Sequence, residues 1–181
     1  MKGSKAAFAG FGLALAAFSF APVAIAATDI SHPTQALQFL DNTTDFGATF
    51  GNNQRNNFFA DKFTFSISDR PYVILESYLS SISSRATNGL EITDFTIRNN
   101  AGVVAQGVQE SRGDIDLWSL YNVTLQPGDY WLQVNGFVVS NTGGSFGANV
   151  NLTPVPEAET WAMMLGGLSV LGALARRRKQ A

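Results

Sequence analysis

The stretch Phe58–Ser68, FFADKFTFSIS, alternates large apolar residues with small or polar ones. One face of the expected strand carries every second residue: Phe59, Asp61, Phe63, Phe65 and Ile67. Successive side chains of a strand point to opposite faces, so a period of two predicts a strand with one buried face. That buried face would hold one carboxylate, Asp61, among four apolar side chains.

Similar runs recur along the middle of the chain, between turn signals rich in glycine, asparagine and proline. Further strands are expected at Leu37–Leu40, Phe46–Phe50, Tyr72–Leu79, Leu90–Arg98, Val123–Leu125, Tyr130–Val139 and Ser145–Thr153. The run from Leu90 breaks phase near Asp94, which indicates a β-bulge. Gln126–Asp129 (QPGD) is typical of a type II turn, and Asn141–Gly144 (NTGG) of a hairpin tip. About seven to nine strands with no helical periodicity predict an all-β fold, an antiparallel β-sandwich of jelly-roll type.

The N-terminal segment has the pattern of a signal peptide. Met1–Lys5 is basic, residues 6–23 carry no charge, and Ala24-Ile25-Ala26 supplies the small residues of a cleavage site. We expect a signal peptide over residues 1–26, cut before Ala27, with a cut after Ala27 as the neighbouring choice. An uncleaved signal anchor is the alternative. A secreted domain is then expected over residues 27–153.

The charge of the expected domain excludes some partners. The whole chain has a net charge of −2, but six of its twelve cations lie in the two tails. Twelve carboxylates remain against six cations in the domain, which gives a net charge near −6. Nucleic acid and anionic lipid both favour a basic surface, so neither is expected as a partner. The chain also has no cysteine, which excludes disulfides, thiolate metal sites and a cysteine nucleophile.

The last 27 residues read VPEAETWAMMLGGLSVLGALARRRKQA. Pro154–Pro156 is expected to be an extended linker. Trp161–Ala175 is fifteen uncharged residues, a helix of about 22 Å, which is short for a bilayer core of about 30 Å. Arg176, Arg177, Arg178 and Lys179 would keep its end on the cytoplasmic side. We therefore expect a single transmembrane helix at 161–175 that retains the protein only for a time; a plain C-terminal anchor is the alternative.

This order of parts resembles the PEP-CTERM sorting signal. The resemblance rests on Val155, Pro156 and Glu157, then Trp161, the glycine-rich apolar helix and the arginine block; Ala158 stands where the namesake triplet has its second proline. Such signals occur in exported proteins of Gram-negative bacteria that make extracellular polysaccharide. The resemblance implies cleavage by exosortase, an integral-membrane protease, and release of the domain to the cell surface or extracellular matrix.

A second resemblance lies in the domain. Phe59, Asp61 and Phe63 match the FxDxF pattern that names one family of PEP-CTERM proteins, and Leu125–Gly136 is similar to that family's turn and following strand. The same turn also looks like that of bacterial pre-peptidase C-terminal β-sandwiches. The FxDxF family has no established enzymatic activity, so this resemblance implies a location more than a chemistry.

Few residues are candidates for chemistry. A buried Asp61 needs hydrogen bonds or a charged partner, and backbone N–H groups of a neighbouring loop are the favoured partners. The alternatives are a calcium ligand and a catalytic acid. Asp114 and Asp116, two apart on an extended chain, could share calcium, or form an ordinary acidic loop. No other metal site is expected.

The remaining candidates favour a protein that is not an enzyme. His32, the only histidine, is interpreted as a solvated residue before the first core strand. The sequence has no nucleophile elbow, phosphate loop or HExxH motif. Four aromatic residues could form a platform for sugar rings or pack in the core: Trp118, Tyr121, Tyr130 and Trp131.

The sequence thus predicts an exported, exosortase-processed protein of the cell surface or matrix, with a structural or adhesive role in exopolysaccharide or biofilm. Its expected partners are exosortase, extracellular polysaccharide and, transiently, the inner membrane. A calcium- or carbohydrate-binding β-sandwich module is the alternative.

Overall fold

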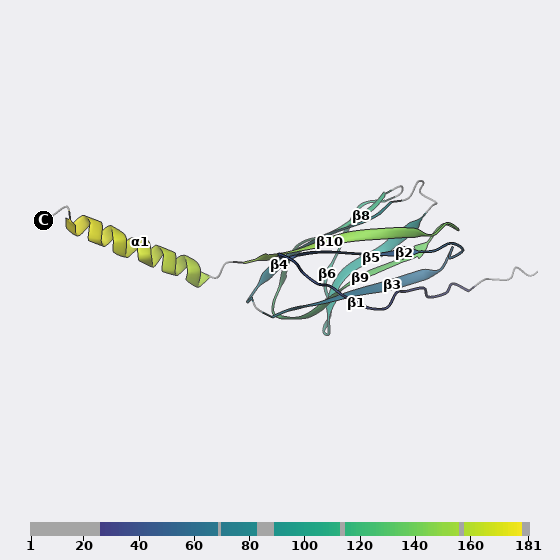
Figure 1. Ribbon diagram of the computed structural model, residues 1–181, viewed down its shortest axis with the longest axis horizontal. Helices are drawn as coiled ribbons and strands as arrows, with labels where there is room; N and C mark the ends of the chain where they lie inside the picture. The colour runs from purple at the N-terminus through teal and green to yellow at the C-terminus, as the bar shows by residue number, and fades with distance from the viewer. Residues whose placement is uncertain (1–25, 69, 83–88, 113–114, 156–157, 179–181) are drawn as a thin grey trace, which may run out of the picture.

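A computed structural model of the chain describes residues 26–68, 70–82, 89–112, 115–155 and 158–178. Within these residues, ten β-strands form two five-stranded sheets that make a β-sandwich, and one helix follows them (Figure 1). The strands are β1 (Gln35–Ala36), β2 (Thr43–Phe50), β3 (Phe58–Ile67), β4 (Val73–Ile82), β5 (Leu90–Asn99), β6 (Gly102–Gln106), β7 (Val108–Ser111), β8 (Ile115–Leu125), β9 (Gly128–Val138) and β10 (Gly144–Pro154). Sheet A has the order β1-β3-β9-β5-β6 and sheet B the order β2-β10-β4-β8-β7. The expected β-sandwich of two packed sheets is confirmed.

The core lies between the sheets and contains the inner face of β3. Burial alternates along the whole of β3, with every second side chain from Phe59 to Ile67 buried. Phe59 stacks on Phe50 of β2 with ring centroids 4.3 Å apart. The ring centroid of Phe63 lies 4.4 Å from that of Phe46, which is also in β2. The period-two prediction is therefore confirmed, and aromatic contacts between the two sheets stabilise this end of the core.

The bulge expected near Asp94 is present. Where β5 pairs with β9, the register shifts between Ile92 and Asp94, so Thr93 is the extra residue. A bulge changes which face the following side chains occupy. Ile92 and Phe95 are both buried in the core, whereas half-buried Asp94 lies on the outer face of sheet A, opposite Asn135 of β9.

The predicted hairpin tip and the predicted type II turn both connect the two sheets. The hairpin predicted at Asn141–Gly144 is wrong, because β9 pairs with β3 and β5 while β10 pairs with β2 and β4. Gln126 and Pro127 likewise lead from β8 in sheet B to β9 in sheet A. Gly128 has a φ of 156°, far from the value near +80° of a type II turn. Because each turn crosses between the sheets, the strands on either side of it each bury one face in the core. A turn motif alone does not indicate whether the chain crosses or stays in one sheet.

The remaining differences occur at strand edges and ends. No strand forms at Leu37–Leu40; β1 lies just before it and pairs in parallel with β3, the one departure from antiparallel pairing among the named strands. Strands β6 and β7, which the sequence analysis did not include, are mostly exposed and lack a buried alternation. Pro154, assigned to a linker, instead ends β10 opposite Val73.

Candidate functional site

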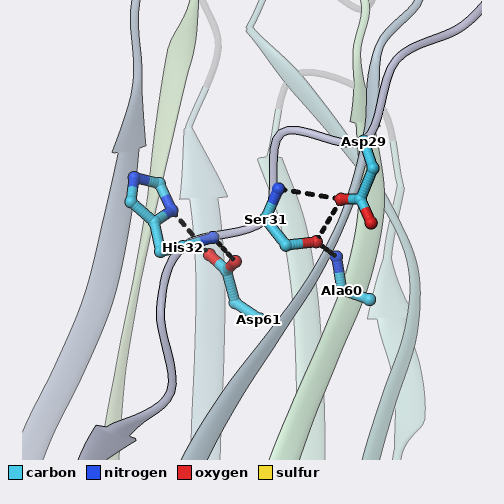
Figure 2. A network of polar contacts seen from close by, with 5 residues as sticks. All are labelled: Asp29, Ser31, His32, Ala60 and Asp61. Carbon is cyan, nitrogen blue, oxygen red and sulfur yellow. Dashed lines mark hydrogen bonds and ion pairs between the residues drawn. The ribbon is translucent and has the colours of Figure 1, made fainter.

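Asp61 lies at the centre of a polar network between β3 and the segment before β1 (Figure 2). Its side chain is buried, with the residue 1% exposed. The backbone N–H of His32 donates to Asp61 Oδ1 at 2.6 Å, and Nδ1 of His32 lies 3.0 Å from Oδ2. Both carboxylate oxygens thus bond the same residue. This is the arrangement favoured from the sequence, a buried carboxylate held by a loop N–H, with an imidazole added.

The interpretation of His32 as a merely solvated residue is wrong. Its side chain remains 44% exposed, but the ring lies 4.9 Å from that of Phe50 and bonds Asp61. The ring also lines a hollow of about 330 Å³ together with Gln35, Thr49 and Lys62. His32 and Asp61 are 29 positions apart in the sequence, so no local pattern indicates this contact. The parallel pairing of β1 with β3 and the bridge between Asp29 and Phe58 bring the two residues together.

A second carboxylate supports the same segment. The hydroxyl of Ser31 donates to Asp29 Oδ1 at 2.5 Å, and its backbone N–H donates to the same atom at 2.9 Å. Ser31 Oγ in turn accepts the N–H of Ala60 in β3 at 2.8 Å (Figure 2). The sequence analysis missed this turn, although an aspartate two residues before a serine is a known signal for it.

The bonds from Ser31 predict a pH dependence. The Ser31 hydroxyl, followed by the Ser31 N–H, lowers the pKa of Asp29 below 3.8, although slight desolvation opposes this. The contribution to stability is then present above pH 3.8 and is lost as the pH falls through the folded-state pKa. In Ser31→Ala, we expect the carboxyl carbon of Asp29 to titrate closer to 3.8 in an NMR titration. An unchanged Asp29 titration in this variant would contradict the assignment.

The second acidic candidate is not assembled as a calcium site in the described residues. Asp114 lies outside the described residues. Asp116 is buried and its Oδ2 accepts the backbone N–H of Ile92 at 3.1 Å, which links β8 of sheet B to β5 of sheet A. Within the described ranges, no group of three or more His, Cys, Asp or Glu side chains is placed to hold a metal ion.

The four aromatic residues considered as a sugar platform do not share a surface. Trp118 and Tyr130 are buried in the core, whereas Tyr121 is 68% exposed on sheet B. Trp131 is half-buried on the outer face of sheet A, because the residue next to the inward Tyr130 must point outward. Core packing, one of the two interpretations offered, is therefore confirmed for Trp118 and Tyr130, and the four residues do not form the alternative platform.

The tail forms helix α1, Ala158–Arg178, which extends away from the sandwich (Figure 1). The helix begins three residues before the predicted range of 161–175 and ends three residues after it. Its large apolar side chains are exposed where described, including Met163 at 79% and Leu171 at 64%. The helix therefore leaves its apolar surface without cover from the strands.

The predicted transmembrane span is not confirmed. Among the helices that the structure describes, none combines the length and apolar character needed to cross a membrane. Pro156, Glu157 and Lys179 lie outside the described residues. Of the signal peptide, residues 1–25, including Ala24, also lie outside them, while Ala26 and Ala27 are exposed at the start of the described chain.

Comparison with protein families gives a match over the tail. Residues 154–179 match the family model described as "PEP-CTERM protein-sorting motif". The chain carries a PEP-CTERM sorting motif. The motif implies export and a membrane-associated sorting signal, and it is processed by exosortase in general. The range contains all eight residues named for sorting: Val155, Pro156, Glu157, Ala158, Trp161, Arg176, Arg177 and Arg178.

The other comparisons add little to the PEP-CTERM match. Among solved structures, the chain is similar to the pre-peptidase C-terminal domain of collagenase from Bacillus anthracis, with 14% identity and a TM-score of 0.38. That similarity covers 66% of this chain and 95% of the other. No curated protein matches the chain. The FxDxF resemblance of Phe59, Asp61 and Phe63 is not confirmed by any of these matches.

Proposed function

We propose that this protein is exported, that exosortase cleaves its PEP-CTERM tail, and that the released β-sandwich remains at the cell surface or in the extracellular matrix. Its role there is structural or adhesive, in exopolysaccharide or biofilm, and it is not an enzyme. The match over residues 154–179 is the observation that supports this proposal most strongly.

The position of the motif relative to the sandwich supports cleavage. Strand β10 ends at Pro154, and the next pairing contact is a single bond from Val155 N–H to the carbonyl of Tyr72 at 3.3 Å. A cut between residues 156 and 159 would therefore remove α1 and leave every strand of the sandwich intact. The cleaved product keeps its core, because the core contains no apolar side chain from α1 among those that the structure describes.

The exposed apolar surface of α1 supports a temporary association with the inner membrane. Its uncharged part, residues 161–175, is about 22 Å long, shorter than a bilayer core of about 30 Å, which suits temporary retention better than a permanent span. Arg176, Arg177 and Arg178 end the helix and favour the cytoplasmic side. In this proposal the helix holds the protein beside exosortase until cleavage.

The environment of the acidic residues supports a role without catalysis. Asp61, the candidate catalytic acid, bonds His32 through both oxygens, and Asp116 bonds Ile92. These contacts tie segments of the sandwich together. Within the described residues, they account for the burial of Asp61 and Asp116 without a bound calcium ion.

Removing the tail tests the sorting proposal. We expect a chain ending at Pro154 to be lost from the surface and matrix fractions of its host, because exosortase has no signal to recognise. Replacing all three residues Arg176, Arg177 and Arg178 with glutamine should also reduce release, whereas a triple lysine variant keeps the charge and should behave as the native chain. Quantitative immunoblots of membrane, surface and medium fractions measure the outcome. An unchanged distribution of the shortened chain would refute sorting by the tail.

A further inference from the structure

A network of hydrogen-bonded side chains crosses the outer face of sheet A. Trp131 Nε1 donates to Gln133 Oε1 at 3.5 Å, and Gln133 Nε2 donates to Asn135 Oδ1 at 2.9 Å. Asn135 Nδ2 then donates to Asp94 Oδ2 at 3.2 Å, and Gln106 Nε2 donates to Asp94 Oδ1 at 3.1 Å. These five residues, here called the amide ladder, join strands β9, β5 and β6.

The amide ladder is an ordered polar surface whose side-chain amides keep N–H donors that the ladder itself does not use. The bonds from Trp131 run in one direction and end on a carboxylate, an arrangement in which successive bonds polarise one another. Each amide nitrogen has two N–H groups, and the bonds above use one of each pair. The bulge at Thr93 is what places Asp94 on this face. A ligand would meet side chains already held in position, which lowers the entropy cost of binding.

Aromatic rings lie at both ends of the ladder. Half-buried Trp131 stands at one end, with the ammonium of Lys62 5.9 Å from its ring centroid. At the other end, Phe137 is 37% exposed and pairs across the strands with Phe58, which is 44% exposed. Trp131 and Phe137 are six positions apart along β9, a span of about 20 Å. The face is thus an elongated strip with flat apolar rings and amide groups between them.

The charges of this strip balance. Lys62 and Arg98 lie on the strands beside Trp131, and Asp94 and Asp129 are carboxylates of the same face, Asp129 accepting a bond from Ser66. Glu91, which pairs with Phe137, also lies on this face and forms an ion pair with Arg112. Three cations against three carboxylates give no net attraction for a highly charged polymer. A protein partner would favour a more apolar interface centre than this polar one. Aromatic rings beside amide groups, without net charge, fit a ligand that has both apolar faces and many hydroxyls.

We propose that the outer face of sheet A binds an uncharged polysaccharide, with sugar rings stacked on Trp131 and sugar hydroxyls bonded to the amide ladder. This inference rests on the proposed location of the protein at the cell surface or matrix, and it names the partner there. It replaces the four-residue platform with a different surface that keeps only Trp131.

Affinity electrophoresis of the purified full chain, in gels containing the neutral polysaccharide fraction of its host's matrix, tests this proposal. The native chain should be retarded, and Trp131→Ala should weaken binding about tenfold or more, because the stacking surface is lost. Asn135→Ala, which interrupts the ladder and leaves the indole in place, should weaken binding as well. Tyr121→Ala is the matched control, since it removes an exposed aromatic ring from sheet B. Thermal melts establish that each variant is folded; if Trp131→Ala is not, Asn135→Ala carries the test.

Several outcomes would overturn the proposal. These are no retardation by the neutral fraction, equal binding by native chain and folded variants, or retardation only by the acidic fraction. Loss of retardation after protease treatment of the polysaccharide would indicate a protein partner instead. The purified chain binds or fails to bind whatever exosortase does, so this result is separate from the test of sorting.

Discussion

Replacing Asp61 with alanine is expected to lower the free energy of unfolding by about 3 kcal/mol. The carboxylate is buried and bonds both the backbone N–H and the imidazole of His32. Its removal leaves that N–H without its acceptor and weakens the attachment of the segment before β1 to β3, where the bond from Ala60 N–H to Ser31 Oγ remains. Chemical denaturation followed by circular dichroism measures the change.

Two further variants separate this effect from a general loss of charge. Asp129→Ala removes an exposed carboxylate that also accepts a side-chain bond, from Ser66, and should cost less than about 0.5 kcal/mol. His32→Ala should cost less than Asp61→Ala, because the backbone N–H at position 32 keeps its acceptor. If Asp61→Ala proved as mild as Asp129→Ala, the network around Asp61 would not hold the edge of the sandwich.

The second large effect is expected at Gly136, which faces Phe59 across β3 and β9. A Cβ atom at position 136 would lie 2.5 Å from the carbonyl oxygen of Glu91 and 2.6 Å from Cζ of Phe59. Neither backbone nor a buried ring can move away at little cost, so Gly136→Ala should destabilise the fold by about 3 kcal/mol. Denaturation curves of the purified variant measure this directly.

Gly147 in β10 is the matched control for Gly136. A Cβ atom there meets nothing within 4 Å, so Gly147→Ala should be neutral or slightly stabilising. Phe59→Leu combined with Gly136→Ala should recover part of the loss, because it relieves the contact with the ring but not the contact with Glu91. Equal stability of the two alanine variants would contradict the close packing described for Phe59.

These residues show what local sequence pattern could predict. The alternation in β3 placed Phe59, Asp61 and Phe63 on the buried face, and the break in phase near Asp94 located the bulge. Both are properties of one strand and its own side chains. The same period-two rule, applied to the neighbours Tyr130 and Trp131, would also have separated them and removed the aromatic platform.

What the sequence could not predict depends on which strands become neighbours. Turn residues at Asn141–Gly144 indicate a reversal of direction but not whether the chain stays in one sheet. The contact of His32 with Asp61 and the ladder from Trp131 to Asp94 each join distant segments, and the register that creates them is set by the packing of the whole sandwich. Exposed strands such as β6 and β7 give no buried alternation to detect.

Intact mass of the protein from its native host, with the exosortase gene present and absent, tests the central claim most directly. With exosortase present, we predict a species that begins near Ala27 and ends between residues 156 and 159. Without exosortase, the mass should retain Arg176, Arg177 and Arg178. A mass that retains these arginines in both strains would contradict processing by exosortase and leave the tail as a simple anchor.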